Sequence, residues 1–246
     1  MRDSTSTSWH LIENQATAQL AGRQGQLDLR RPESGFLWQG PQQQSLQLLR
    51  LHDGLQCPEL SSRLKPYIRE EDLIVNYGDR EMLPFNLQIY WRRRSYPAQK
   101  ECNVMDWILA MQTDCLGDQS HLNTSTTGSG ANEILHLPVA NEKSAEVIHS
   151  NSRFSAEEST GCILVRLGKM SYIELIHPRD FLSVEIEHSK DQSEFGIQRS
   201  IFNCHLEKGV IVRARLQGLC VPRENDTSLM RTAYQAFLQH ALPLTT

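Results

Sequence analysis

Two short segments of this sequence carry side chains that suit acid/base chemistry. In IHPRDF, His177 and Asp180 lie in a predicted loop between two strands, where catalytic groups are often found. In FNCHLEKG, His205 and Glu207 share one face of a predicted hairpin. A histidine beside a carboxylate can transfer protons near neutral pH, although such pairs are also common structural contacts. These four residues are the predicted catalytic residues of a sugar-active enzyme, epimerase-like or lyase-like.

A third segment, FNLQIYWRRRSY at residues 85 to 96, has side chains that suit ligand binding. Because residues i and i+2 of a strand share a face, its apolar side chains point one way, while Gln88, Tyr90, Arg92 and Arg94 point the other way. A sugar ring can lie on the tyrosine while the forked guanidinium donors meet hydroxyl or carboxylate oxygens. The alternative interpretation is a solvated outer face, which many antiparallel sheets have.

Charged residues in two later strands extend this hypothesis. The alternation of VIVRARLQ places Arg213 and Arg215 on one face, and that of FLSVEIEH does the same for Glu185 and Glu187. If these strands were neighbours in one sheet, the four groups would form weak cross-strand pairs or converge as acid, base and oxyanion-holding groups. The predicted binding residues for a carbohydrate-like or small anionic ligand are Gln88, Tyr90, Arg92, Arg94, Arg213 and Arg215.

The composition is typical of a globular protein and excludes some partners. The chain has 246 residues, of which 39% are apolar and 22% are charged, and its mean hydropathy is -0.45. A chain of this length can bury a sizeable core without disulfides or a structural metal. The formal net charge of -4 gives no reason to expect binding to nucleic acid or to an anionic membrane.

Cysteine spacing and short motifs predict neither a metal nor a cofactor. The six cysteines are scattered, with no CxxC and no Cys/His cluster at zinc spacing, and we expect buried reduced thiols. The motifs GxGxxG, GxSxG and HExxH and the P-loop are absent. The first residues lack an apolar signal core, and no apolar run reaches the length of a membrane span. We therefore expect a cytoplasmic protein with no membrane partner.

Short runs of alternating apolar and polar residues recur along the chain and predict antiparallel strands. Residues 103 to 116 fit a strand or a buried helix, and the strands on both sides favour a strand. The other predicted strands are 16 to 21, 25 to 30, 35 to 40, 45 to 52, 72 to 79, 85 to 96, 162 to 167, 171 to 177, 181 to 188, 200 to 206 and 210 to 221.

Two segments differ from this strand pattern. Residues 117 to 160 are rich in Ser, Thr, Asn and Gly and are predicted to be a long irregular insertion. Within it, 134 to 139 is a strand-like run that Pro138 restricts to a sheet edge, and 145 to 150 is a second short candidate. The segment DTSLMRTAYQAFLQHAL predicts a C-terminal helix at about 227 to 241, because Asp226 or Thr227 can cap it and its apolar residues recur at helical spacing.

Together these elements predict a mostly β fold. We expect a large antiparallel β-sandwich in a single domain over residues 1 to 246, with one C-terminal α-helix and the irregular insertion. On this fold the leading hypothesis is a carbohydrate-binding protein. The alternatives are the acid/base enzyme and an assembly protein whose strand edges and terminal helix form a homo-oligomer interface.

Overall fold

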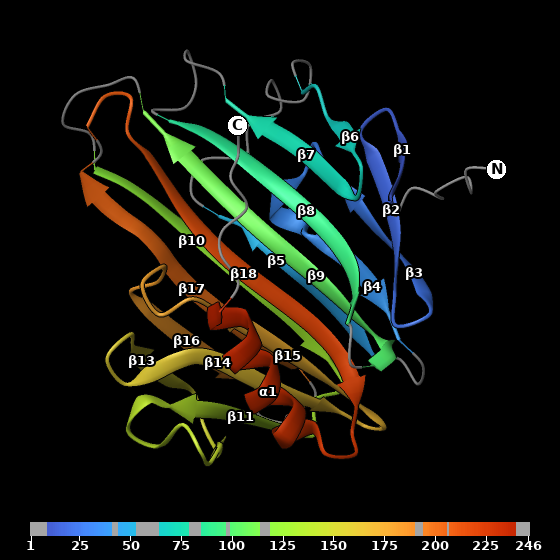
Figure 1. Cartoon of the computed structure of the whole chain (residues 1–246), viewed down its shortest axis with the longest axis vertical. Helices are drawn as coiled ribbons and strands as arrows, with labels where there is room; N and C mark the ends of the chain where they lie inside the picture. Colours follow the sequence, from blue (N-terminus) through green and yellow to red (C-terminus); the bar gives the residue numbers. More distant parts are fainter. Residues whose placement is uncertain are drawn as a thin grey trace.

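Two nine-stranded antiparallel sheets form most of the computed structural model and pack face to face (Figure 1). This arrangement confirms the predicted mostly β fold of sandwich type. The structure describes residues 9–40, 44–52, 64–78, 85–96, 99–113, 119–189, 194–205 and 207–239. Within these ranges no helix is long and apolar enough to cross a membrane.

Sheet A joins the N-terminal meander to strands from the second half of the chain. Its strand order is β1-β2-β3-β4-β5-β10-β17-β16-β13. In that order the bounds are β1 Trp9–Ile12, β2 Gln15–Leu20, β3 Arg23–Asp28, β4 Phe36–Gln39, β5 Ser45–Leu51, β10 Gln119–Ser129, β17 Glu194–His205, β16 Ser183–His188 and β13 Ser152–Ser155. Strands β2 to β5 confirm the predicted meander, whereas β1 was not predicted. A short 3-10 helix, η1 (Pro32–Ser34), precedes β4.

Sheet B has the strand order β12-β11-β14-β15-β18-β9-β8-β7-β6. In that order the bounds are β12 Glu146–Ile148, β11 Glu133–Pro138, β14 Ser159–Leu167, β15 Met170–Ile176, β18 Ile211–Pro222, β9 Gln99–Gln112, β8 Asn86–Tyr96, β7 Asp72–Tyr77 and β6 Tyr67–Arg69. The ambiguous segment at 103 to 116 lies mostly in β9, so the strand interpretation is confirmed. The 3-10 helix η3 (Val139–Asn141) follows β11.

The segment from 117 to 160 is not the irregular insertion that we predicted. It contains β10 to β13 and the start of β14. β11 and β12 coincide with the two predicted strand-like runs, although β11 lies between β12 and β14 rather than at an edge. β10, which was not predicted, lies between β5 and β17 inside sheet A. The polar run of β10 hides the alternation because both of its faces are polar: Thr124 and Thr126 are buried, while Thr127 hydrogen-bonds Gln47 at 3.1 Å on the outer face. Pairing on both sides satisfies the backbone of this strand despite its composition.

Aromatic side chains fill the space between the two sheets. The apolar face of β8 is buried there as predicted, and Trp91 meets Trp107 edge to face with ring centroids 6.0 Å apart. Trp9 meets Trp91 in the same way at 6.3 Å. Edge-to-face contacts of this kind stabilise a core in addition to the stabilisation that comes from burying the apolar area of the rings.

A buried ion pair also links the sheets. Arg199 on β17 of sheet A is 1% exposed and pairs with Glu174 on β15 of sheet B, which is 2% exposed. Thr126 and Tyr172 donate to one oxygen of that carboxylate at 2.5 and 2.7 Å, and Arg199 donates to the carbonyl of Gly161 at 3.1 Å. These partners compensate much of the cost of removing two charges from water.

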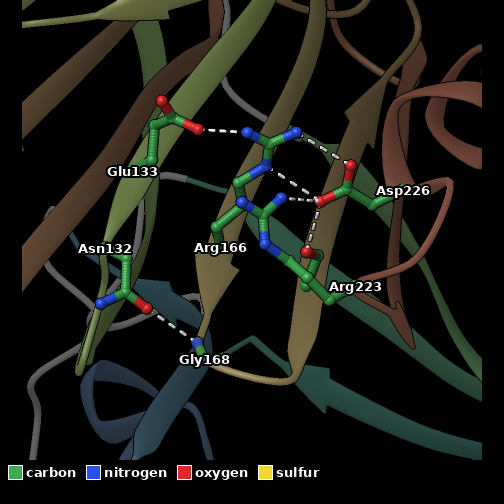
Figure 2. A network of polar contacts seen from close by, with 7 residues as sticks. Asn132, Glu133, Arg166, Gly168, Arg223 and Asp226 are labelled. Atoms are coloured by element: carbon green, nitrogen blue, oxygen red, sulfur yellow. Dashed lines mark hydrogen bonds and ion pairs between the residues drawn. The ribbon is translucent and has the colours of Figure 1, made fainter.

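Helix α1 (Asp226–Gln239) confirms the predicted C-terminal helix and lies on the outer face of sheet B, over β14, β15 and β18 (Figure 1). Asp226, at its first residue, is 2% exposed. Figure 2 shows that Asp226 receives hydrogen bonds from Arg166 at 3.0 and 3.1 Å and from Arg223 at 2.7 Å, and that Arg166 also pairs with Glu133. Ser171 donates to the same carboxylate at 2.8 Å. This network holds the start of α1 against sheet B. In that sheet, β9, β8 and β7 follow β18 on the side away from β14 and β15.

Two of the six cysteines, Cys162 and Cys220, have described side chains, and both are buried thiols outside any disulfide. This agrees with the expectation for these two residues. The side chains of the other cysteines lie outside the described residues.

We predict that the stability of the sandwich falls as the pH is lowered from 7 to 5, in part because of His136. This residue of β11 is 6% exposed, stacks on Phe154 with centroids 4.3 Å apart, and has Nε2 3.5 Å from Glu146. Burial lowers the pKa of His136, and Glu146 offsets this only in part. As the pH falls, the unfolded chain therefore takes up the proton before the folded protein does. The contribution of neutral His136 to the free energy of unfolding is complete above the ordinary histidine pKa of about 6.5, and it decreases as the pH falls from there through the lower pKa of the folded state.

Urea unfolding at pH 7 and pH 5 checks this prediction. His136→Phe should reduce the loss of stability between the two values, whereas His10→Gln, at an exposed position, should leave it unchanged. Burial also lowers the pKa of His188, so part of the loss should persist in the first variant. An unchanged loss in His136→Phe would contradict the assignment.

Candidate functional site

The structure brings the six predicted binding residues together on the outer face of sheet B. We call this surface the arginine face: Gln88, Tyr90, Arg92, Arg94, Arg213 and Arg215. They come from β8 and β18, which flank β9. The register places Gln88 and Arg213 opposite the same residue of β9, Ala110, and Tyr90 and Arg215 opposite Ile108.

Most of the donors on the arginine face are already paired with protein groups. Arg92 donates to both oxygens of Asp72 at 2.6 and 2.7 Å, and this contact raises the pKa of Arg92. Arg94 pairs with Asp106, which also accepts a hydrogen bond of 2.5 Å from Gln217. A ligand carboxylate at either arginine would therefore have to compete with a protein carboxylate that is already in place.

The two arginines of β18 have different environments. Arg215 is 7% exposed, donates to the carbonyl of Phe237 in α1 and lies 4.0 Å from the centre of that ring. Burial lowers the pKa of Arg215, and its contacts hold the helix against the sheet. Arg213 is half-buried, lies near Tyr90, and forms no hydrogen bond or ion pair within the part of the chain that the structure describes.

The loop with His177 and Asp180 lies next to Arg215. The amide of Asp180 donates to the carbonyl of His177 at 2.8 Å, and the amide of Arg179 donates to Nδ1 of His177 at 3.3 Å. The amide of Arg215 donates to the Asp180 carboxylate at 3.0 Å. Burial raises the pKa of Asp180, although this hydrogen bond acts in the opposite direction. The two residues thus shape a turn and join the loop to β18, and their catalytic role stays a prediction.

The other two predicted catalytic residues lie where β17 ends and the turn to β18 begins. The backbone of His205 pairs with Gln119 in sheet A, and its side chain lies outside the described residues. Glu207 is exposed in the turn before β18. The structure does not place this pair beside His177 and Asp180 in a described hollow, and its catalytic role also stays a prediction.

The cross-strand pairing of Glu185 and Glu187 with Arg213 and Arg215 was wrong. The two glutamates lie on β16 in sheet A, whereas the arginines lie on β18 in sheet B. The chain passes from one sheet to the other between β15 and β16, so strands that are close in sequence face different partners. Glu185 instead lies opposite Gln198 of β17 in sheet A.

A hollow lies on the outer face of sheet A, away from the arginine face. We call it the sheet A hollow; its volume is about 770 Å³. Four adjacent strands, β5, β10, β17 and β16, supply most of its wall. The lining residues are Leu37, Ser45, Gln47, Arg50, Thr127, Gly128, Ser129, Asn151, Glu187, His188, Ser189, Glu194, Phe195 and Gly196.

Gly196 leaves an open floor in this hollow. The register aligns Gln47, Thr127, Gly196 and Glu187 in one row across the four strands. A Cβ at Gly196 would meet nothing closer than the carboxylate of Glu187 at 3.7 Å, so neither the backbone nor the core requires glycine there. A flat ring could therefore rest on the strand backbone between hydrogen-bonding side chains.

Several polar groups in the sheet A hollow have no partner among the described residues. The side chains of Glu187 and Glu194 form no hydrogen bond or ion pair within the described ranges. Arg50 donates through Nε to the carbonyl of Glu33 at 2.9 Å, which leaves the terminal nitrogens of its guanidinium available. The ring nitrogens of His188 are buried and unpaired in the described structure, and burial lowers its pKa, so this side chain is neutral at pH 7.

Sequence reasoning missed most of the sheet A hollow. The alternation of β16 correctly placed Glu187 on an outer face, but the polar run of β10 concealed Thr127 and its neighbours. An isolated glycine inside a strand pattern often marks a position where another group approaches the backbone, and Gly196 has that pattern. This was the one local signal for the floor of the hollow.

Comparison with known proteins gives information about the fold. No protein-family model matches the sequence, and no curated protein matches it. Among solved structures, the alpha-N-acetylgalactosaminidase NagBb from Bifidobacterium bifidum, in complex with GalNAc, superposes with a TM-score of 0.50 at 9% identity. The match covers 94% of this chain and 38% of the glycosidase.

A second solved structure is a Klebsiella pneumoniae subsp. pneumoniae protein provisionally assigned as an aldose 1-epimerase. It has a TM-score of 0.40 at 9% identity, and the match covers 74% of this chain and 61% of that one. This chain thus spans less than two thirds of either protein. Of the two, the likeness to the glycosidase is the informative one: it shows that this chain shares the β-sandwich fold of part of a larger sugar-active protein.

Proposed function

We propose that this protein binds a carbohydrate-like ligand in the sheet A hollow. The observation that carries the proposal is the open floor at Gly196, which lies in a row of hydrogen-bonding side chains. Sugars present hydroxyl groups that both donate and accept, and the lining supplies hydroxyl, amide, carboxylate and guanidinium groups for both roles. The volume of about 770 Å³ is in the range of small-molecule sites.

The structural likeness supports this proposal only as an analogy of fold. The glycosidase was solved in complex with GalNAc, a sugar derivative. Function depends on the site rather than on the fold, so the argument rests on the sheet A hollow itself.

The arginine face is a second candidate surface, for a carboxylated ligand. The observation in its favour is the guanidinium of Arg213 beside Tyr90, which is unpaired within the described residues. Arg213→Met should abolish binding of a uronic acid if this surface binds it, and should leave binding in the sheet A hollow unchanged.

We predict that Gly196→Phe abolishes saccharide binding without unfolding the protein. The new ring would fill the floor of the hollow, and position 196 has room for a Cβ at an ordinary backbone conformation. A thermal-shift screen with neutral oligosaccharides measures the effect, because a ligand at 100 times its Kd stabilises the native state by about 2.7 kcal/mol. The affinity of the variant should fall at least about tenfold, or about 1.4 kcal/mol.

The matched control is Gln19→Phe. Gln19 is exposed on the outer face of sheet A, on β2, and does not line the hollow. This variant should keep the ligand-induced rise in melting temperature. A rise that persists in Gly196→Phe, or that no saccharide produces in the natural protein, would contradict the proposed function.

A further inference from the structure

Two carboxylates flank the open floor of the sheet A hollow. Glu187 on β16 lies directly opposite Gly196, and Glu194 lies two residues before Gly196 on the same face of β17. A diagonal pair of this kind has Cα atoms about 7–8 Å apart. Both side chains line the hollow, and neither is paired with a described residue.

The positive charge in the hollow does not balance these carboxylates. Arg50 is the one arginine or lysine among the described residues that line the hollow, and its Nε is bound to the carbonyl of Glu33. His188 is neutral at pH 7 because burial lowers its pKa. Two carboxylates against one guanidinium leave the described lining of the hollow with a net negative charge.

We infer that the ligand of the sheet A hollow is a sugar with a positively charged amino group, which Glu187 and Glu194 recognise. The inference rests on the proposed function and names its ligand class. An ammonium group donates charge-assisted hydrogen bonds to carboxylates, whereas a uronic acid placed on the same floor would meet like charges. The hydroxyl and amide groups of Thr127, Ser129 and Gln47 would then contact the uncharged part of the sugar.

The test compares three oligosaccharides of equal length: a chitosan tetramer with free amines, its fully N-acetylated counterpart, and tetragalacturonate. Calorimetry at pH 6 and low salt measures their affinities. The chitosan tetramer should bind about three- to tenfold more tightly than the N-acetylated tetramer, since exposed charge pairs contribute modestly. This advantage should shrink at high salt, and tetragalacturonate should bind most weakly.

The double variant Glu187→Gln, Glu194→Gln should lose the preference for the free amine while retaining the affinity for the N-acetylated tetramer. The matched control is Glu185→Gln, which lies on the same strand and face but does not line the hollow. It should keep the preference.

The outcomes separate the two proposals. If the N-acetylated tetramer or tetragalacturonate binds as tightly as the chitosan tetramer, or if the preference survives in the double variant, the inference about charge is overturned and the proposed function stands. If none of the three binds, the proposed function fails, and the inference fails with it.

Discussion

Replacing Arg199 by methionine should lower the free energy of unfolding by about 3–5 kcal/mol, because the substitution leaves Glu174 as an uncompensated charge in the core. Both residues are at most 2% exposed and lie between the two sheets, where water cannot replace the missing partner. Urea unfolding at pH 7 measures the change, and a loss below about 1 kcal/mol would refute this account of the pair.

Two further variants separate the charge from the packing. Arg199→Met combined with Glu174→Leu should recover a large part of the lost stability, because removing both partners leaves no buried charge. Recovery should be incomplete, since Thr126 and Tyr172 both donate to Glu174 and would lose their acceptor. The matched control is Arg153→Met, at an exposed arginine of sheet A, which should change stability by less than about 0.5 kcal/mol.

Replacing Trp107 by alanine should lower the free energy of unfolding by about 3–5 kcal/mol through the cavity that it leaves. The indole is fully buried and meets Trp91 edge to face at 6.0 Å. Gly218, in the neighbouring strand β18, makes room for it: a Cβ at that position would lie 2.6 Å from Cη2 of Trp107 and 2.8 Å from the hydroxyl of Tyr172. The indole of Trp107 therefore occupies space that is available only because position 218 has no side chain.

Thermal and urea unfolding check this second effect. Trp107→Phe should cost less than the alanine variant, because a ring remains to fill part of the space. Tyr67→Ala, at a tyrosine that is 44% exposed, should stay within about 0.5 kcal/mol of the natural protein. An alanine variant as stable as the Tyr67→Ala control would contradict the prediction, because it would mean that the core rearranges to fill the cavity.

The strands of this protein could be predicted because their signal is local. In β8 the alternation correctly separated the core face, with Trp91, from the polar face, with Gln88 and Arg92. The helical spacing after Asp226 likewise predicted α1. The prediction failed for β10, where Thr126 is buried because it donates to Glu174, a partner 48 residues away that the local pattern cannot reveal.

The candidate sites depended more strongly on the tertiary structure. The local pattern placed Arg92 and Arg94 on one face, but their ion pairs with Asp72 and Asp106 follow from the register of β7, β8 and β9. The pairing of Glu187 with Arg213 or Arg215 failed because β16 and β18 belong to different sheets. Strand alternation shows which side chains share a face and does not show which strands are neighbours.

The sequence by itself thus determined the fold class, most strands, their faces and the terminal helix, since each follows from the spacing of apolar residues within one segment. Only the tertiary structure decided where a ligand has room. The sheet A hollow combines Gln47, Thr127, Gly196 and Glu187 from four adjacent strands, of which only β16 and β17 are consecutive in the chain. Non-local pairing brings β5, β10 and the β16–β17 hairpin together, and no local pattern of residues specifies it.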